Sequence, residues 1–219
     1  MTAARPLLLV GAGGFARETA AAAAFCPEWT VLGLCDDDPA RHGTTVDGLP
    51  VLGPAEVVHE YPTTAVLLCT GSPRNFARRA ALAARLALPP ERYGTLAHPA
   101  AAVARGTVLG PGTVLLAGVV VTSPQRIGAH VAAMPQVVLT HDDEVGDFVT
   151  LASRVALGGG VVVEPGAYLG AGALVREGLT IGAGALVGMG SVVLADVPAG
   201  EVWAGNPARP VRSRAGAPT

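Results

Sequence analysis

The sequence predicts an α/β fold in two parts: a small Rossmann-like parallel sheet at the N-terminus, then a left-handed parallel β-helix built from hexapeptide repeats. Two observations lead to this expectation. An aliphatic residue recurs at every sixth position from 103 to 193, with Ala133 as the only small member of the series. The preceding residues lack that period and alternate short apolar runs with Ala-rich stretches.

We assign residues 1–92 to the sheet domain. Apolar runs at 7–10, 31–35 and 65–69 predict three buried strands, since turn-forming residues follow each run. The Ala-rich stretch that ends near Phe25 predicts a first helix. Residues 75–88 predict a second helix, which Pro89 and Pro90 end. Strands that alternate with helices indicate a parallel sheet.

We assign residues 93–212 to the β-helix and residues 213–219 to a disordered tail. Three hexads form one triangular coil of about eighteen residues, so the repeat builds a little over five coils. Stacked strands lie about 4.8 Å apart, which predicts a prism roughly 25 Å long. Prisms of this class commonly form trimers with clefts between the subunits, and we expect a homotrimer.

Composition excludes several classes of partner. The formal net charge of −2 and the lack of a basic run argue against nucleic acid and against anionic membrane surfaces. Cys26, Cys35 and Cys69 show no CxxC spacing, which indicates buried thiols in a reducing compartment. Neither a signal sequence nor an apolar segment of spanning length is present, so we expect a soluble cytoplasmic protein.

The spacing of the histidines argues against a metal site. A prism of this kind serves acyltransferases and the gamma class of zinc carbonic anhydrases, and the zinc class uses a pair of histidines five residues apart. Five residues after His130 stands Pro135, and five after His141 stands Gly146. Without such a pair the zinc site lacks its ligands. Acyl transfer is therefore the expected chemistry, with no metal.

His141 is the favoured general base for acyl transfer. It lies in the only acidic hexad of the repeat, and the adjacent Asp142 can hold the imidazole in one tautomer. An acidic edge that merely keeps the protein soluble explains the same residues equally well. The remaining histidines are expected in surface or packing roles, the last of them on a solvated face: His42, His59, His98 and His130.

Gly159 follows His141 by one coil and lies in a run of three glycines. Next to the imidazole, a residue without a side chain leaves room for a thioester, and its bare N–H group can face an oxyanion. The alternative is that glycine only suits the corner of a hexad. No cysteine lies near this position, which favours direct transfer over a covalent acyl-enzyme.

The glycines near the N-terminus indicate a phosphate site. Gly11-x-Gly13-x-x-Ala16 stands between an expected strand and an expected helix, and Asp36 ends the second expected strand. A helix N-terminus favours any phosphate, and the short domain favours a nucleotide-linked substrate over NAD. NAD binding is a further alternative, as are glycines that serve only a tight turn.

These features together resemble the family of sialic acid O-acetyltransferases and UDP-4-amino-sugar N-acetyltransferases of bacterial glycan pathways. The resemblance covers nearly the whole chain. Besides the unbroken hexads it is carried by Gly11-Ala12-Gly13-Gly14, Asp36-Asp37-Asp38-Pro39, Gly48-Leu49-Pro50-Val51-Leu52-Gly53, His98-Pro99, His141-Asp142 and Gly205-Asn206-Pro207-Ala208-Arg209.

The resemblance implies a trimer that transfers acetyl from acetyl-CoA to a sugar amine or hydroxyl. It implies His141 as the general base, with Asp142 as the acidic neighbour that tunes it. Many members of the family have His where this chain has Thr150 and a polar residue where it has Phe15. The implied nucleotide-sugar contacts are Gly13, Gly14, Phe15, Asp36, Asp37, Gly71 and Ser72, and the implied coenzyme contacts are Thr150, Gly159, Ala171 and Met189.

We therefore expect an acetyl-CoA-dependent acetyltransferase that acts on the amine of a nucleotide-linked amino sugar. The alternatives are O-acetylation of a sialic acid or another sugar, and acylation of an acceptor that is not a sugar. A non-catalytic protein that binds nucleotide-sugars on the same scaffold is an alternative from another class.

Overall fold

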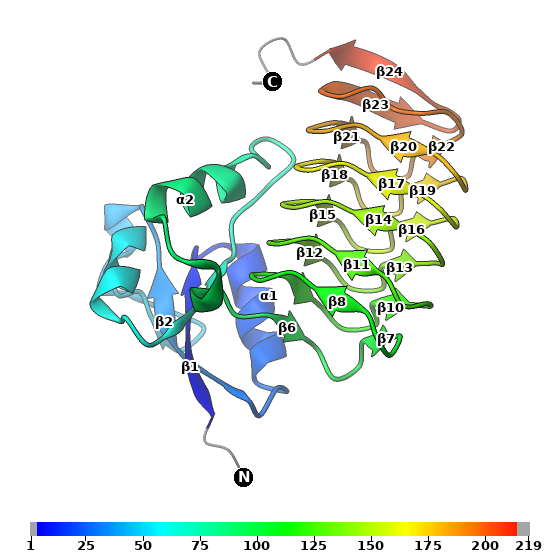
Figure 1. Ribbon diagram of the computed structural model, residues 1–219. Helices are drawn as coiled ribbons and strands as arrows, with labels where there is room; N and C mark the ends of the chain where they lie inside the picture. Colours follow the sequence, from blue (N-terminus) through cyan, green and yellow to red (C-terminus); the bar gives the residue numbers. More distant parts are fainter. Residues whose placement is uncertain (1–3, 214–219) are drawn as a thin grey trace.

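The computed structural model describes residues 4–213 and shows a small α/β part packed beside a tall solenoid (Figure 1). The α/β part holds a parallel sheet of three strands in the order β2-β1-β5. These strands are β1 (Arg5–Val10), β2 (Trp29–Cys35) and β5 (Ala65–Leu68). The three predicted strands are confirmed, and β2 begins two residues earlier than expected.

Both predicted helices are confirmed but are shorter than expected. The first, α1 (Gly14–Ala23), ends two residues before Phe25. The second, α2 (Arg78–Leu86), begins three residues later than expected, after a turn at residues 76–77, and its C-cap Ala87 has the left-handed φ of 46°. Smaller elements complete this part: 3-10 turns η1 (Pro39–Arg41), η2 (Ala55–Glu60) and η3 (Pro90–Arg92), and the hairpin of β3 (Thr45–Val46) and β4 (Leu49–Pro50).

The solenoid consists of two-residue strands that pair in parallel with the strand one coil further on, as in Val120 with Val138. Each aliphatic residue of the repeat is the second residue of its strand. The strands are β6 (Leu96–Ala97), β7 (Ala102–Val103), β8 (Val108–Leu109), β9 (Val114–Leu115), β10 (Val120–Val121), β11 (Arg126–Ile127), β12 (Ala132–Ala133), β13 (Val138–Leu139), β14 (Glu144–Val145), β15 (Thr150–Leu151), β16 (Ala156–Leu157), β17 (Val162–Val163), β18 (Tyr168–Leu169), β19 (Leu174–Val175), β20 (Thr180–Ile181), β21 (Leu186–Val187) and β22 (Val192–Val193).

Three flat faces enclose the aliphatic core of the solenoid. The β7–β22 face holds six strands, the β8–β20 face holds five, and the face from β6 to β24 (Ala208–Ser213), the β6–β24 face, holds eight. The predicted series of aliphatic residues fills the interior, where Leu115, Leu139 and Leu151 are fully buried. Removing this apolar surface from water is the main force that holds the coils together, at about 25 cal/mol per Å². The predicted β-helix is confirmed.

The corners between the faces carry residues with positive φ. Most are glycines, such as Gly160 and Gly178 with φ near 70°. Over one stretch of the solenoid the corner residues have side chains instead: His130, Gln136, Asp142, Phe148 and Arg154, with φ between 54° and 64°.

A hairpin of β23 (Glu201–Gly205) and β24 (Ala208–Ser213) closes the far end of the solenoid. Trp203 packs against the core and donates its indole N–H to Glu201 at 2.7 Å. Strand β24 includes Ser213, the first residue of the expected tail, and residues 214–219 lie outside the described part of the chain. Within residues 4–213 no helix has the length and apolarity needed to cross a membrane.

The α/β part packs on the β6–β24 face of the solenoid. Its core is continuous with residues of that face, since Leu96, Val114 and Leu116 belong to the same buried cluster as Leu7 and Leu9. Around residues 93–96 the chain passes from one part to the other: Tyr93 bridges to Val66, whereas Leu96 pairs with Val114. This packing places the loops at the end of β1 and β5 next to the solenoid.

Candidate active site

His141 and Asp142 form the predicted pair. The imidazole Nδ1 lies 2.8 Å from the Asp142 carboxylate, so that carboxylate can fix the tautomer that leaves Nε2 free. Both side chains are exposed, at 70% and 83%. They occupy the corner after β13, at the vertex where the β7–β22 face meets the β8–β20 face. The geometry is that of a base held by a carboxylate and open on its other side.

Asp143, the next residue, has a structural role. Its side chain is 2% exposed and accepts hydrogen bonds from the N–H groups of Thr140 and Val161, at 2.8 and 2.9 Å. Burial raises the pKa of this carboxyl, and the two N–H groups partly oppose that shift. Asp143 therefore holds the corner in shape and gives the exposed pair of His141 and Asp142 a buried anchor.

Gly159 lies directly beside the imidazole, as the spacing of one coil predicts. A Cβ atom built on Gly159 would lie 2.5 Å from Nε2 of His141, well inside van der Waals contact. The φ of Gly159 is not in the left-handed region, so the backbone does not require glycine there. The three atoms nearest to that Cβ all belong to the ring of His141. This observation favours a site over the alternative that glycine only suits the corner.

A cavity of about 520 Å³ opens at the ends of β1, β2 and β5 in the α/β part. All seven residues expected to contact a nucleotide-sugar line it: Gly13, Gly14, Phe15, Asp36, Asp37, Gly71 and Ser72. We call it the nucleotide cavity. The structure thus brings together residues that are up to about sixty positions apart in the chain.

The glycines of the nucleotide cavity have two different reasons to be glycine. Gly11 has a φ of 118°, and a Cβ there would lie 2.6 Å from the carbonyl oxygen of Cys69, so the fold requires it. Gly13 and Gly14 have ordinary φ values, and a Cβ on either would meet nothing within 4 Å. They border α1, whose N-terminus has no side-chain cap. Open space beside unpaired helix N–H groups is what a phosphate needs.

Charged side chains surround the nucleotide cavity. Asp36 accepts from the Ala12 N–H at 2.8 Å and so anchors the glycine loop. The hydrogen bond from Arg85, at 2.7 Å, is the main reason that the pKa of Asp37 is lowered. Arg41 and Arg78 also line the cavity, and sequence reasoning missed both. Only the fold brings these cations to the glycine loop, because no motif marks them in the sequence.

A second cavity of about 250 Å³ lies between α1 and the β6–β24 face. It shares Gly14, Phe15 and Gly71 with the nucleotide cavity, so the two are adjacent. Thr150 and Ala171, two of the expected coenzyme contacts, line it. The other lining residues, which the sequence did not point to, include Arg79, Ser153 and Tyr168.

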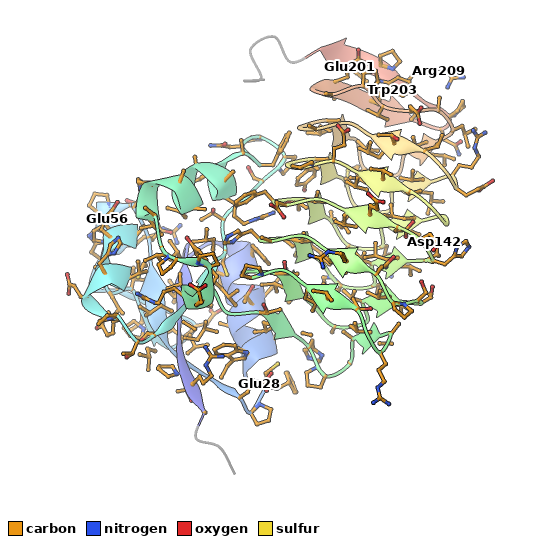
Figure 2. All side chains as sticks on the ribbon, in the orientation of Figure 1. Glu28, Glu56, Asp142, Glu201, Trp203 and Arg209 are labelled. Atoms are coloured by element: carbon orange, nitrogen blue, oxygen red, sulfur yellow. The ribbon has the colours of Figure 1, made fainter. Side chains whose placement is uncertain are left out.

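The four expected coenzyme contacts do not meet within one chain. Met189 stands one coil beyond Ala171 on the same edge and is 78% exposed. Gly159 lies with His141 at the vertex opposite the β6–β24 face, which the α/β part covers. Figure 2 shows Asp142 at the edge of the solenoid turned away from the α/β part. Within one chain His141 is therefore separated from both cavities.

The expectation that His130 is solvated is wrong. Its side chain is only 6% exposed, with its ring stacked on Phe148 and edge-on to Tyr93, at centroid distances of 4.8 and 4.4 Å. Burial lowers its pKa to about 4, and nearby Arg79 adds to the shift. The reason is packing: His130 occupies the corner that the α/β part covers, so it is neutral and structural.

The expected packing roles of His42 and His98 and the expected burial of the cysteines are confirmed. His42 lies half-buried in the loop after β2, with Nε2 2.7 Å from the carbonyl oxygen of Asp36, and His98 packs against Phe25. All three cysteines are free and buried. Among residues 4–213 no cluster of three or more potential metal ligands occurs.

Comparisons with known proteins found similar sequences and folds. The family model of the PglD N-terminal domain matches residues 6–78, and a comparison with curated proteins found no match. A mutant of perosamine N-acetyltransferase from Caulobacter crescentus, in complex with CoA and GDP-perosamine, is 30% identical, with 95% of this chain and 97% of that chain covered and a TM-score of 0.84.

Two further solved structures resemble both parts of the chain. The acetyltransferase domain of PglB from Neisseria gonorrhoeae FA1090, in complex with acetyl coenzyme A, is 27% identical, with coverage of 95% and 100% and a TM-score of 0.82. WeeI from Acinetobacter baumannii AYE is 26% identical, with coverage of 94% and 100% and a TM-score of 0.78. The similarity confirms the predicted fold class over nearly the full length.

Proposed function

Because the chain belongs to the family of PglD-like sugar N-acetyltransferases, we propose that it transfers the acetyl group of acetyl-CoA to the amine of a nucleotide-linked amino sugar. One observation carries the proposal: the imidazole of His141 occupies the space that a side chain at Gly159 would fill. A base with a carboxylate on Nδ1 and an open face on Nε2 suits proton abstraction from an attacking amine.

In the proposed reaction the amine nitrogen attacks the thioester carbonyl carbon while Nε2 of His141 takes a proton from that nitrogen. Asp142 stabilises the imidazolium that forms, at 2.8 Å from Nδ1. The N–H of Gly159 donates to the developing oxyanion. Collapse of the tetrahedral intermediate breaks the C–S bond, forms the amide and releases CoA as the thiol, with the imidazolium as the source of its proton.

The nucleotide cavity supplies the binding site of the acceptor. Gly13 and Gly14 leave room for the diphosphate at the N-terminus of α1, and Arg41 and Arg78 provide positive charge at the same cavity. A relative bound to GDP-perosamine supports a nucleotide-linked amino sugar as the acceptor class. The amine of such a sugar favours N-acetylation over the O-acetylation alternative.

We also propose a homotrimer whose active sites form between protomers. His141 and Gly159 lie on one edge of the solenoid, whereas both cavities lie on the opposite side. A second copy can bring its His141 edge to the cavities of the first. The coenzyme would then run between Gly159 of one protomer and Thr150, Ala171 and Met189 of the next. Free buried cysteines fit the cytoplasm as the proposed location.

The first experiment measures acetyl transfer to a panel of UDP-, GDP-, dTDP- and CMP-linked amino sugars by release of free CoA. We expect turnover with one nucleotide class and a loss of about 10²–10⁴-fold in kcat for His141→Asn. His59→Asn is the matched control and should behave as the wild type. Lack of turnover with every acceptor, or near-normal turnover of His141→Asn, would refute the proposal.

A second experiment tests the shared site. His141→Asn removes the proposed base, and Gly13→Val blocks the nucleotide cavity. In a mixed trimer, an intact His141 from one variant can meet an intact nucleotide cavity from the other. Unfolding and refolding a mixture of the two inactive variants should produce mixed trimers that regain part of the wild-type activity. Separately refolded variants are the control. If the mixture stays as inactive as its components, the active site does not form between protomers.

A further inference from the structure

Arg79 is a buried cation with an unusual set of partners. It is the second residue of α2, and its side chain is 1% exposed. None of the described carboxylates pairs with it, and its charge faces only carbonyl and hydroxyl oxygens. Burial lowers the pKa of this guanidinium to about 10, so it stays charged at neutral pH. A charge that is costly to bury and lacks a counterion calls for a reason.

The bonds of Arg79 tie three segments together. Nη1 donates to the carbonyl of Thr70, in the loop that lines the nucleotide cavity, at 3.2 Å. Nε donates to the carbonyl of His130 at 2.8 Å, and Nη2 to those of Phe148 and Val149 at 2.9 and 3.1 Å. Most of the guanidinium is thus fixed by backbone carbonyls of two successive coils, which leaves little freedom in its orientation.

The remaining bond of Arg79 sets the role of Thr150. Nη2 donates to the Thr150 hydroxyl oxygen at 2.9 Å. A hydroxyl has one proton to give, and the hydroxyl proton of Thr150 has no acceptor in residues 4–213. The side chain is 9% exposed and lines the second cavity. Thr150 therefore has a free hydroxyl proton to donate to whatever occupies that cavity.

We propose that Arg79 is a positioning residue that holds the Thr150 hydroxyl as a hydrogen-bond donor toward the acyl oxygen of the thioester. The inference rests on the proposed function, and it adds a side-chain donor to the N–H of Gly159. The second cavity shares three lining residues with the nucleotide cavity, and under the proposed function the sugar amine and the thioester meet there. An acyl oxygen gains negative charge during transfer, and a donor polarised by a buried cation stabilises that charge most.

The test compares Thr150→Val, which removes the hydroxyl, with Thr150→Ser, which keeps it. We expect kcat/KM for acetyl-CoA to fall about tenfold in Thr150→Val and to recover to within about threefold of the wild type in Thr150→Ser. Binding of the nucleotide-sugar alone, measured by calorimetry, should stay unchanged in both. If the methyl group of Thr150 orients the hydroxyl instead of Arg79, Thr150→Ser loses as much as Thr150→Val, and the inference is wrong.

Arg79→Lys completes a double-mutant cycle with Thr150→Val, with Arg79→Gln as a second cycle where the lysine variant does not fold. Because Arg79 acts through Thr150, we expect the double variant to be no slower than the slower single variant. If the fold-losses in kcat/KM of the two single variants multiply in the double variant, the inference is wrong. Weaker binding of the nucleotide-sugar with unchanged acetyl-CoA kinetics would also overturn it. The kcat/KM values of the variants relative to the wild type test the inference alone. An inactive wild type would refute the proposed function and the inference with it.

Discussion

Replacement of Gly159 by alanine should inactivate the enzyme without weakening its fold. The new Cβ would lie 2.5 Å from Nε2 of His141, about 1 Å inside the usual contact distance of 3.5–4.0 Å. The imidazole is 70% exposed and can swing aside, which separates it from Asp142. A base misplaced by about 1 Å loses on the order of 10²-fold in rate, which corresponds to about 2.7 kcal/mol of transition-state stabilisation.

The stability of Gly159→Ala should be equal to or above that of the wild type. Gly159 has an ordinary φ, so alanine fits the backbone and mainly restricts the unfolded chain, a gain of about 0.4–1 kcal/mol. Gly178→Ala, one coil beyond Gly160 at the same corner, is the control. Its φ of 68° is strained for alanine and its Cβ meets nothing within 4 Å, so it should lose about 1 kcal/mol of stability and keep its activity.

The assay measures kcat from release of CoA and the free energy of unfolding from urea titration, for both variants and the wild type. The expected result is a crossed pattern: activity lost with stability kept in Gly159→Ala, and the reverse in Gly178→Ala. Near-normal kcat in Gly159→Ala would show that the imidazole does not act from this position. A large loss of stability in that variant would show that packing of the corner, not the imidazole, requires the glycine.

Three other predictions follow from the described residues. The pKa of His130 is lowered to about 4 in the folded protein, so its contribution to stability is full above about pH 6.5 and is lost as the pH falls toward 4. Urea titration should show the free energy of unfolding falling by up to about 3 kcal/mol over this range. A His130→Phe variant should lack that loss. Burial raises the pKa of Cys35 and Cys69 to about 12, so a thiol reagent at pH 8 should label them only after unfolding, and rapid labelling of the native protein would contradict this. Gly13→Val should weaken nucleotide-sugar binding at least tenfold in calorimetry with little change in melting temperature, because its side chain would point into open space; unchanged affinity would place the diphosphate elsewhere.

The repeat predicts the solenoid almost residue by residue because each coil uses only local rules. An aliphatic residue every sixth position determines which side chain points inward, and neighbouring coils then pair in register. The spacing of eighteen residues is also enough to predict that Gly159 lies beside His141. What the pattern does not distinguish is the role of three adjacent carboxylates, since exposed Asp142 and buried Asp143 look alike in sequence.

Contacts between the two parts are beyond sequence reasoning. His130 has the sequence surroundings of an exposed corner, yet Arg79, fifty-one positions earlier, donates to its carbonyl and the α/β part covers its ring. Arg79 itself lies in an Ala- and Arg-rich helix, where a basic residue usually faces water. Long-range packing of this kind depends on how two separate patterns meet, and neither pattern contains that information.

The corner residues with side chains have a consequence for evolution and engineering. His130, Gln136, Asp142, Phe148 and Arg154 adopt φ values that favour glycine, each at about 1 kcal/mol, and they occupy five successive corners. Asp142 pairs with the imidazole of His141, and the rings of His130 and Phe148 stack. Arg154 donates to the side chain of Gln136. At Asp142, which is exposed, a search for thermostable variants would favour glycine, and that gain would trade away turnover.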